Sequence, residues 1–136
     1  MPTHFNRKEL EELRTRKQKR PAMRLTSSTT VEHEYRRCGG HPSYAFVKFE
    51  CVPANELSFE VEAQWPSTVP EGYRSLLELA IAEGVADVLL DGLYQHTGCA
   101  VTLVEIRYDE IESSEQAFMM TSRRAMEDLL KAEWDA

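Results

Sequence analysis

Three consecutive segments in the first half of the chain alternate between apolar and polar residues. In residues 30–37, every second residue from Glu32 to Arg36 is charged. Residues 44–52 and 57–63 follow the same period of two, and short turns separate the three segments. This alternation is typical of strands with one buried and one solvated face. We therefore expect an antiparallel meander with one face packed on the core.

The pattern then changes to a period of three to four residues. From Tyr73 to Leu89 the apolar residues recur at helical spacing, which predicts a long amphipathic helix. Pro70 stands where this helix can begin, and Gly92 where it can end. Gly84 lies on its apolar side, where glycine costs about 0.5–1 kcal/mol relative to alanine. We expect a close approach between the helix and the sheet to offset this cost.

The remaining sequence predicts a fourth strand and a second helix. Residues 100–108 alternate, so that one face is shared by Ala100, Thr102, Val104, Ile106 and Tyr108. At the start of the last helix, Ser113 can cap the first N–H groups and Gln116 can complete a capping box. The buried side of this helix is expected to carry Phe118, Ser122, Ala125 and Leu129. The predicted fold class is α+β, in the order β-β-β-α-β-α, with a four-stranded, mostly antiparallel sheet and two helices packed on one face.

Charge is distributed unevenly along the chain, whose formal net charge is -7. Residues 1–20 carry seven basic and three acidic residues, a net charge of +4, whereas residues 21–136 carry nine basic and twenty acidic residues, a net charge of -11. We interpret residues 1–20 as a basic N-terminal arm, helical or frayed, and residues 21–136 as one domain. RNA would attract the arm and repel the body, although a merely solvated extension is the alternative interpretation. The arm residues assigned to RNA contact are Arg14, Arg16, Lys17, Lys19 and Arg20.

Composition excludes several classes of protein. The 136-residue chain has no apolar run approaching the roughly 20 residues that span a membrane. Its first residues lack the apolar core of a secretory signal. Three cysteines are an odd and sparse set, which fits a reducing compartment better than a disulfide scaffold. We therefore expect a cytoplasmic protein without a membrane partner.

Metal and catalytic chemistry find little support in the sequence. His33, Cys38 and His41 could contribute to a zinc site, but zinc prefers four ligands, and no second pair follows unless Cys99 or His96 comes near in space. No positioned base accompanies any of the three cysteines. The chain also lacks the G-x-x-x-x-G-K-[ST] pattern that cradles nucleotide phosphates. The prediction is a non-enzymatic protein without metal, cofactor or nucleotide.

The turn at residues 38–43 is the main candidate for contact with a partner. Its two glycines can take positive φ, two arginines precede it, and a tyrosine follows it. Basic side chains beside an exposed aromatic ring can hold a phosphate and stack on a base. In the alternative interpretation, the tyrosine packs in the sheet and the arginines pair with Glu32 or Glu34. The candidate RNA-binding residues are Arg36, Arg37, Gly39, Gly40, His41 and Tyr44.

Four motifs in order resemble domain IV of translation elongation factor G. Residues 38–53 are similar to its first tip loop, T-G-G-x-G-Q-Y-G/A-x-V, and to the following strand, which ends near a proline. Residues 68–73 and 83–85 fit the V-I-P-x-x-Y and K-G-I segments of its long helix. Residues 112–118 fit D-S-S-E-x-A-F. The resemblance covers approximately residues 22–130.

The resemblance implies a fold similar to ribosomal protein S5 domain 2, with a left-handed β-α-β crossover. It also implies a relation to the ribosome, because in this family domain IV reaches the decoding region through its tip loops. Only domain IV is matched, so GTP hydrolysis is not carried over. The expected function is a non-enzymatic, translation-factor-like module that contacts ribosomal or other structured RNA through residues 36–44 and the basic arm.

The alternative function is a protein-interaction module, homodimeric or with another protein, that kept the fold and lost ribosome binding. Pro42 and Ser43 replace the glycine and glutamine of the family's first tip loop. The second tip loop, residues 108–112, is short and acidic, and its acidic residues would repel a phosphate backbone. These departures favour the alternative.

Overall fold

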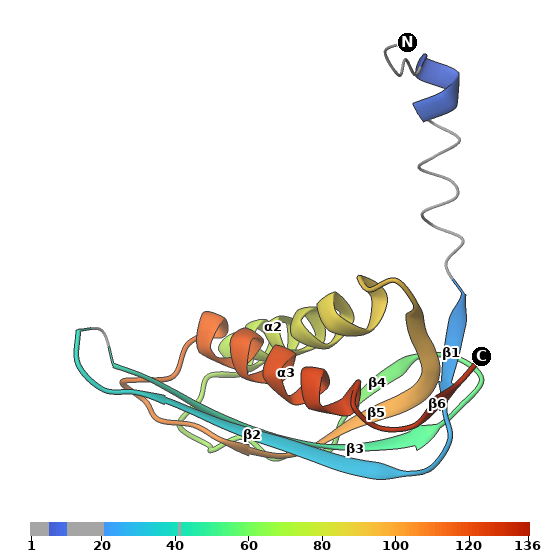
Figure 1. Ribbon diagram of the computed structural model, residues 1–136. Helices are drawn as coiled ribbons and strands as arrows, with labels where there is room; N and C mark the ends of the chain where they lie inside the picture. Colours follow the sequence, from blue (N-terminus) through green and yellow to red (C-terminus); the bar gives the residue numbers. More distant parts are fainter. Residues whose placement is uncertain (1–5, 11–20, 41) are drawn as a thin grey trace.

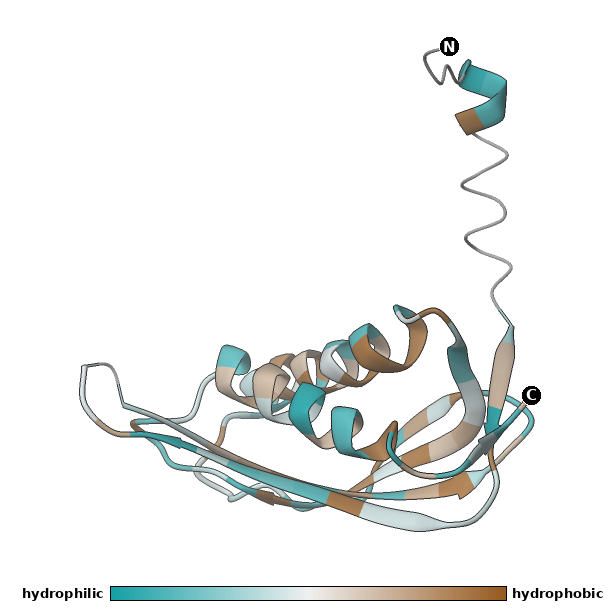
Figure 2. Ribbon diagram, viewed as in Figure 1, coloured by the Kyte–Doolittle hydropathy of each residue, from teal (hydrophilic) through white to brown (hydrophobic). Residues whose placement is uncertain are grey.

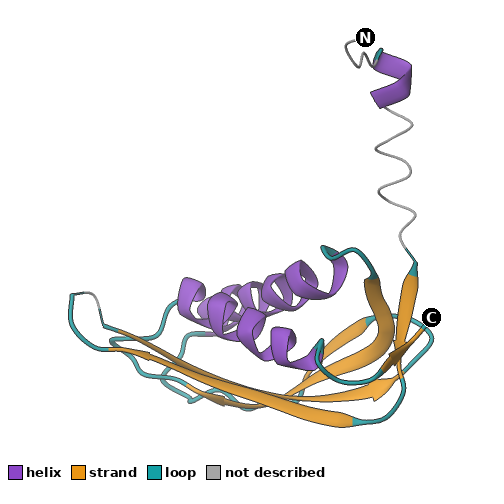
Figure 3. Cartoon of the chain, viewed as in Figure 1, coloured by secondary structure: helices purple, strands orange, loops and turns teal. Residues whose placement is uncertain are grey.

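The computed structural model describes residues 6–10, 21–40 and 42–136. A mixed sheet and two long helices on one of its faces form the described domain (Figures 1 and 3). Along the chain the elements are β1 (Ala22–Leu25), β2 (Thr29–Arg37), β3 (Ser43–Pro53), β4 (Ser58–Val61), α2 (Glu71–Leu90), β5 (Gln95–Arg107), α3 (Glu115–Leu129) and β6 (Trp134–Asp135). The α+β class and the two helices on one face are as predicted.

The N-terminal region is described only in part. Residues 7–10 form a helical turn, in which the Glu9 backbone N–H donates to Asn6 Oδ1 at 2.9 Å. The cationic residues predicted to contact RNA from the arm, and His41 of the turn, lie outside the described residues. Among the helices that are described, none is both long and apolar enough to cross a membrane.

The predicted strand count of four is wrong, because the described residues form a sheet of six strands. Its order is β2-β3-β5-β1-β6, and β4 pairs with β5 beside this path. The short strands β1 and β6 could not be predicted from alternation of apolar and polar residues, because four and two residues are too few to establish a period. β1 and β4 both run parallel to β5, so the sheet is mixed.

The predicted meander ends after its first hairpin. β2 and β3 pair antiparallel from Thr29↔Cys51 to Arg37↔Ser43, and the other edge of β3 pairs antiparallel with β5. Both edges of β3 are therefore occupied. β4 pairs instead with the far edge of β5, parallel, from Ser58↔Ala100 to Val61↔Leu103.

A bulge in β5 also corrects the predicted face of that strand. Phe49 pairs with Leu103 while Lys48 pairs with Glu105, so the register shifts by one residue between them. Beyond such a shift the side chains exchange faces. Within the predicted strand, residues 100–108, the buried residues are therefore Val101, Leu103 and Ile106 rather than a single alternating set that includes Ala100, Thr102 and Val104.

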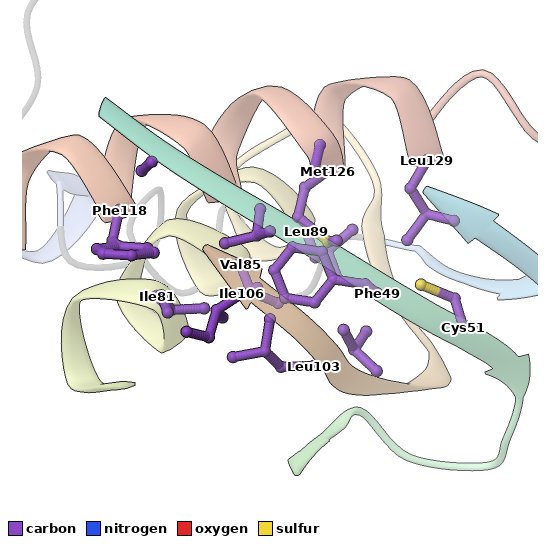
Figure 4. Close-up of a cluster of buried hydrophobic side chains, with 14 of the residues drawn as sticks. Phe49, Cys51, Ile81, Val85, Leu89, Leu103, Ile106, Phe118, Met126 and Leu129 are labelled. Atoms are coloured by element: carbon purple, nitrogen blue, oxygen red, sulfur yellow. The ribbon is translucent and has the colours of Figure 1, made fainter. Parts of the chain in front are cut away.

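The core lies between the sheet and the two helices. β3 contributes Phe49 and Cys51, β5 contributes Leu103, and their side chains meet residues of both helices (Figure 4). The predicted buried side of α3 is confirmed, since the four residues assigned to it are fully buried: Phe118, Ser122, Ala125 and Leu129.

Gly84 lies at a close approach between helices, not between a helix and the sheet as predicted. A Cβ atom built on Gly84 would lie 2.6 Å from the Met119 carbonyl oxygen and 3.0 Å from Ser122 Cβ. The contact is thus with the backbone of α3. Glycine is required here because any side chain would separate the two helices.

Candidate functional site

The β2–β3 hairpin extends beyond the rest of the sheet at one end of the molecule (Figure 1). Strand pairing continues to Arg37↔Ser43, immediately before the turn. Gly39 and Gly40 have φ values of +85° and +63°, which confirms the prediction of positive φ. No atom outside the adjacent chain lies within 4 Å of a Cβ built on Gly39. The glycine turn is therefore open on the side where a side chain would be.

A second loop, residues 108–114, packs against the base of this hairpin. Asp109 Oδ1 accepts hydrogen bonds from the backbone N–H groups of Ile111 and Glu112, both at 2.9 Å. These hydrogen bonds lower the pKa of Asp109 below its ordinary value. The Tyr44 backbone N–H donates to the Glu112 carbonyl at 3.1 Å. The second loop is therefore hydrogen-bonded to the start of β3, next to the glycine turn.

Ser113 connects the second loop to strand β3 instead of capping α3 as predicted. Its buried hydroxyl donates to the Tyr44 carbonyl at 2.8 Å and accepts from the Asp109 backbone N–H at 2.9 Å. The helix cap is Ser114, whose hydroxyl accepts from the Ala117 N–H at 3.1 Å. The sequence pattern could not distinguish adjacent serines, because either one lies within reach of the first helical turn.

Tyr44 is buried in the sheet, so its ring is not available to stack on a base. Only 8% of the residue is exposed, and its hydroxyl donates to Glu34 Oε2 at 3.2 Å. Burial, and secondly this hydrogen bond, raise the pKa of Tyr44. The guanidinium carbon of Arg36 lies 4.6 Å from the centre of the ring. The ring therefore supports Arg36 through a cation–π contact.

Arg107 repeats this arrangement one step along the sheet, and sequence reasoning did not identify it. Its guanidinium carbon lies 4.3 Å from the centre of the Phe46 ring, and Nη1 lies 3.7 Å from Glu34 Oε2. Phe46 pairs with both Glu34 and Arg107 on the neighbouring strands. The one feature of the sequence that could have indicated this contact is that Phe46, an aromatic residue, occupies a polar position of an alternating strand. Two arginines thus cover two aromatic rings on the sheet face opposite the helices.

Arg37 lies on the other side of the hairpin from Arg36, as alternation requires. It lines a cavity of about 460 Å³ between the hairpin, the second loop and the start of α3. The opposite orientations divide the predicted cationic pair. The Arg36 side chain lies on the open face of the sheet, whereas the Arg37 side chain lines the cavity.

Strand β1, the element that follows the arm in the sequence, lies at the opposite end of the domain from the hairpin tip (Figure 1). Ala22, the first residue of β1, pairs with Gln95 at the start of β5, whereas the tip lies beyond Arg107 at its end. At about 3.3 Å per residue, the 13 residues of β5 span roughly 40 Å. The start of β1 and the hairpin tip are therefore separated by about the length of the sheet.

The described residues offer no metal cluster, and two of the three thiols are buried. No group of three or more metal-ligating side chains occurs among them, so His33 and Cys38 do not assemble a site there. Burial raises the pKa of Cys51 to about 12 and that of Cys99 to about 11. Cys38, in contrast, is exposed beside the glycine turn.

Comparison with known proteins places this geometry in a family. Residues 22–133 match the family model for elongation factor G, domain IV. Elongation factor G of Fervidobacterium nodosum is 28% identical over 110 residues, which cover 79% of this chain and 16% of that protein. A crystal structure from Thermus thermophilus shares the fold, with a TM-score of 0.69 and 23% identity over 85% of this chain and 17% of that chain.

The chain therefore spans about one sixth of the length of these two proteins. The match begins at the first residue of β1 and extends past α3, so it includes both tip loops and both long helices. A domain model that matches this much of the chain establishes the family. This chain belongs to the elongation factor G domain IV family.

Proposed function

We propose that this protein is a translation-factor-like module that contacts structured RNA through its hairpin tip. The observation that supports it most directly is the exposed, positioned guanidinium of Arg36 beside an open glycine turn. A guanidinium group recognises phosphate through a planar set of N–H donors. Stacking on Tyr44 restricts the orientation of these donors before RNA arrives, so less conformational entropy is lost on binding.

Each candidate residue has a distinct part in this contact. Arg36 would bind phosphate on the open face of the sheet, and Arg37 would do so beside the cavity. Gly39 and Gly40 would allow a sugar–phosphate backbone to approach the polypeptide closely. Tyr44 would position Arg36 without touching RNA itself. The arm cations Arg14, Arg16, Lys17, Lys19 and Arg20 would supply a separate electrostatic contact.

Salt-dependent RNA binding tests the proposal. A structured ribosomal RNA fragment is titrated with the full chain in filter-binding assays at about 50 and 200 mM salt. Arg36→Gln with Arg37→Gln is expected to weaken binding and to reduce the salt slope by about one unit per phosphate contact. The matched control is Arg123→Gln with Arg124→Gln, two exposed arginines on α3. Undetectable binding at low salt, or equal effects of both pairs, would contradict the proposal.

Protein interaction is the second candidate function, and the acidic second loop favours it. Asp109, Glu110 and Glu112 lie beside the hairpin tip and would oppose phosphate there. Co-sedimentation with isolated ribosomal subunits separates the two candidates. Recovery of the full chain with a subunit, reduced by the Arg36 and Arg37 changes, supports RNA contact. A chain that stays in the supernatant and elutes as a dimer supports protein interaction.

A further inference from the structure

Helix α2 is apolar on two sides, and the second apolar side faces solvent. Its inner side carries the buried residues Leu77, Ile81 and Leu89. Leu76 and Leu79, on the other side, are 48% and 56% exposed. Figure 2 shows hydrophobic residues on successive turns of α2, whereas the neighbouring α3 is more hydrophilic. Apolar residues on a second, solvent-facing side of a helix are typical of a side that a further element covers.

The exposed apolar residues are concentrated on this helix. Among the described residues, eight large hydrophobic side chains are exposed, and five of them lie on α2 or within the next four residues: Leu76, Leu79, Leu90, Leu93 and Tyr94. Scattered exposed leucines need no explanation, but a concentration on one element marks a surface for interaction.

A groove between α2 and α3 gives this surface a shape. The helices touch at Gly84, and toward their N-terminal ends a depression of about 260 Å³ opens between them. Its apolar wall consists of Leu76, Leu79, Ala80 and Met119. Methionine is flexible and polarisable, and it adapts readily to an incoming apolar side chain. We call this depression the α2–α3 groove.

The rim of the α2–α3 groove is acidic. Glu83 and Glu115 line it, and among the described residues no lysine or arginine does so. Asp87 lies one helical turn beyond Glu83 and is also exposed. Carboxylates disfavour RNA and anionic membranes, and a second copy of the chain would bring a like-charged rim against this one.

We propose that the α2–α3 groove binds a basic amphipathic helix of a partner protein. Leucine side chains at i, i+3 or i+4 on the partner would enter the groove beside Leu76 and Leu79. Lysine or arginine side chains flanking them would lie against Glu83 and Glu115. This surface is independent of the RNA contact proposed for the hairpin tip, since none of its residues belongs to the hairpin.

Fluorescence anisotropy with a defined probe tests the proposal. The probe is a labelled 18-residue peptide with leucines at i, i+3, i+4 and i+7 and lysines on its flanks. One matched peptide has glutamates in place of the lysines, and another has serines in place of the leucines. The full chain is expected to bind only the first. The affinity should fall about tenfold in the Leu76→Ser, Leu79→Ser double variant, because both side chains belong to the apolar wall of the groove.

Charge reversal provides a second variant that leaves the apolar surface intact. The Glu83→Lys, Glu115→Lys double variant should bind the lysine peptide several-fold more weakly than the wild type and should also bind the glutamate peptide. Two controls alter exposed residues outside the groove, Ile111→Ser for the apolar change and Glu56→Lys for the charge change. Both are expected to bind as the wild type does.

Three results would overturn the proposal. In the first, the groove variants and the controls bind the lysine peptide equally. In the second, the wild-type chain is a dimer that Leu79→Ser dissociates, which assigns the groove to a second copy. In the third, peptide affinity rises when the arm cations at residues 14–20 are replaced by glutamine in the full chain, which assigns the groove to the chain's own basic segment.

Discussion

Replacing Gly84 by alanine tests the packing of the two helices with a single methyl group. In an isolated helix this change is favourable by about 1 kcal/mol, since alanine is the better helix former. Here the added Cβ would lie 2.6 Å from the Met119 carbonyl oxygen and 3.3 Å from the Arg123 nitrogen. Both are backbone atoms of α3, so they cannot move as a side chain can. The helices must separate to accommodate the methyl group.

The expected change in the free energy of unfolding of Gly84→Ala is the difference between the cost of overpacking and the gain in helix propensity. Overpacking of a well-packed core costs about 1–3 kcal/mol, and a backbone obstacle places Gly84→Ala at the upper end of this range. After subtraction of the helix-propensity gain, the free energy of unfolding should fall by about 2 kcal/mol. For a domain of this size, this corresponds to a melting temperature lower by roughly 6–10 °C.

Gly72 provides a matched control within the same helix. Apart from the neighbouring backbone of the helix itself, no atom lies within 4 Å of a Cβ built there, so Gly72→Ala gains helix propensity without a clash. It should raise the free energy of unfolding by up to about 1 kcal/mol. Urea denaturation followed by circular dichroism measures both variants. The reasoning is refuted if Gly84→Ala is as stable as the wild type, or if the two variants shift stability in the same direction.

Three further predictions concern single side chains. Ser113→Ala removes a buried hydroxyl that makes two hydrogen bonds, one to Tyr44 of β3 and one within the second loop, so urea denaturation should show a loss of about 1–3 kcal/mol, and an unchanged midpoint would exclude a stabilising role. Iodoacetamide at about pH 8 should label only Cys38 in the folded protein, because burial raises the pKa of Cys51 to about 12 and that of Cys99 to about 11. Mass spectrometry that finds all three cysteines labelled without denaturant would contradict this prediction. Burial lowers the pKa of His96, so the folded state favours the neutral imidazole. The free energy of unfolding should therefore be highest above about pH 6.5 and should decline as the pH falls below that value, because the unfolded state then binds a proton that the folded state does not. Unfolding curves at about pH 7.5 and 5.5 can measure this decline, which should be absent in His96→Phe.

The sequence predicted the local elements better than their pairing. Alternation located β2 and β3, and helical spacing located α2 between Pro70 and Gly92, because each pattern extends over enough residues to establish a period. The partner of β4 was not predictable from its own residues. It depends on which edges of β3 are already occupied, and a strand at residues 95–107 occupies one of them. The β5 bulge likewise leaves no mark in the local pattern.

The tip was predicted from residue types, and its internal organisation was not. The positive φ of the two glycines follows from their chemistry alone. The burial of Tyr44 depends on Glu34 and Arg36 on the neighbouring strand. Arg107 is 61 residues distant from Phe46 in the sequence, so only the folded sheet places the two side by side. Contacts between distant segments are the part that composition and periodicity do not encode.

The central position of β5 has a consequence for the order of events during protein synthesis. β3, β4 and β1 all pair with it, and all three precede it in the chain. Until residue 107 has been made, a nascent chain can form little more than the β2–β3 hairpin and α2. Assembly is therefore a late event that the final third of the polypeptide triggers, and truncation before this point would leave an unpaired hairpin edge exposed to other growing chains.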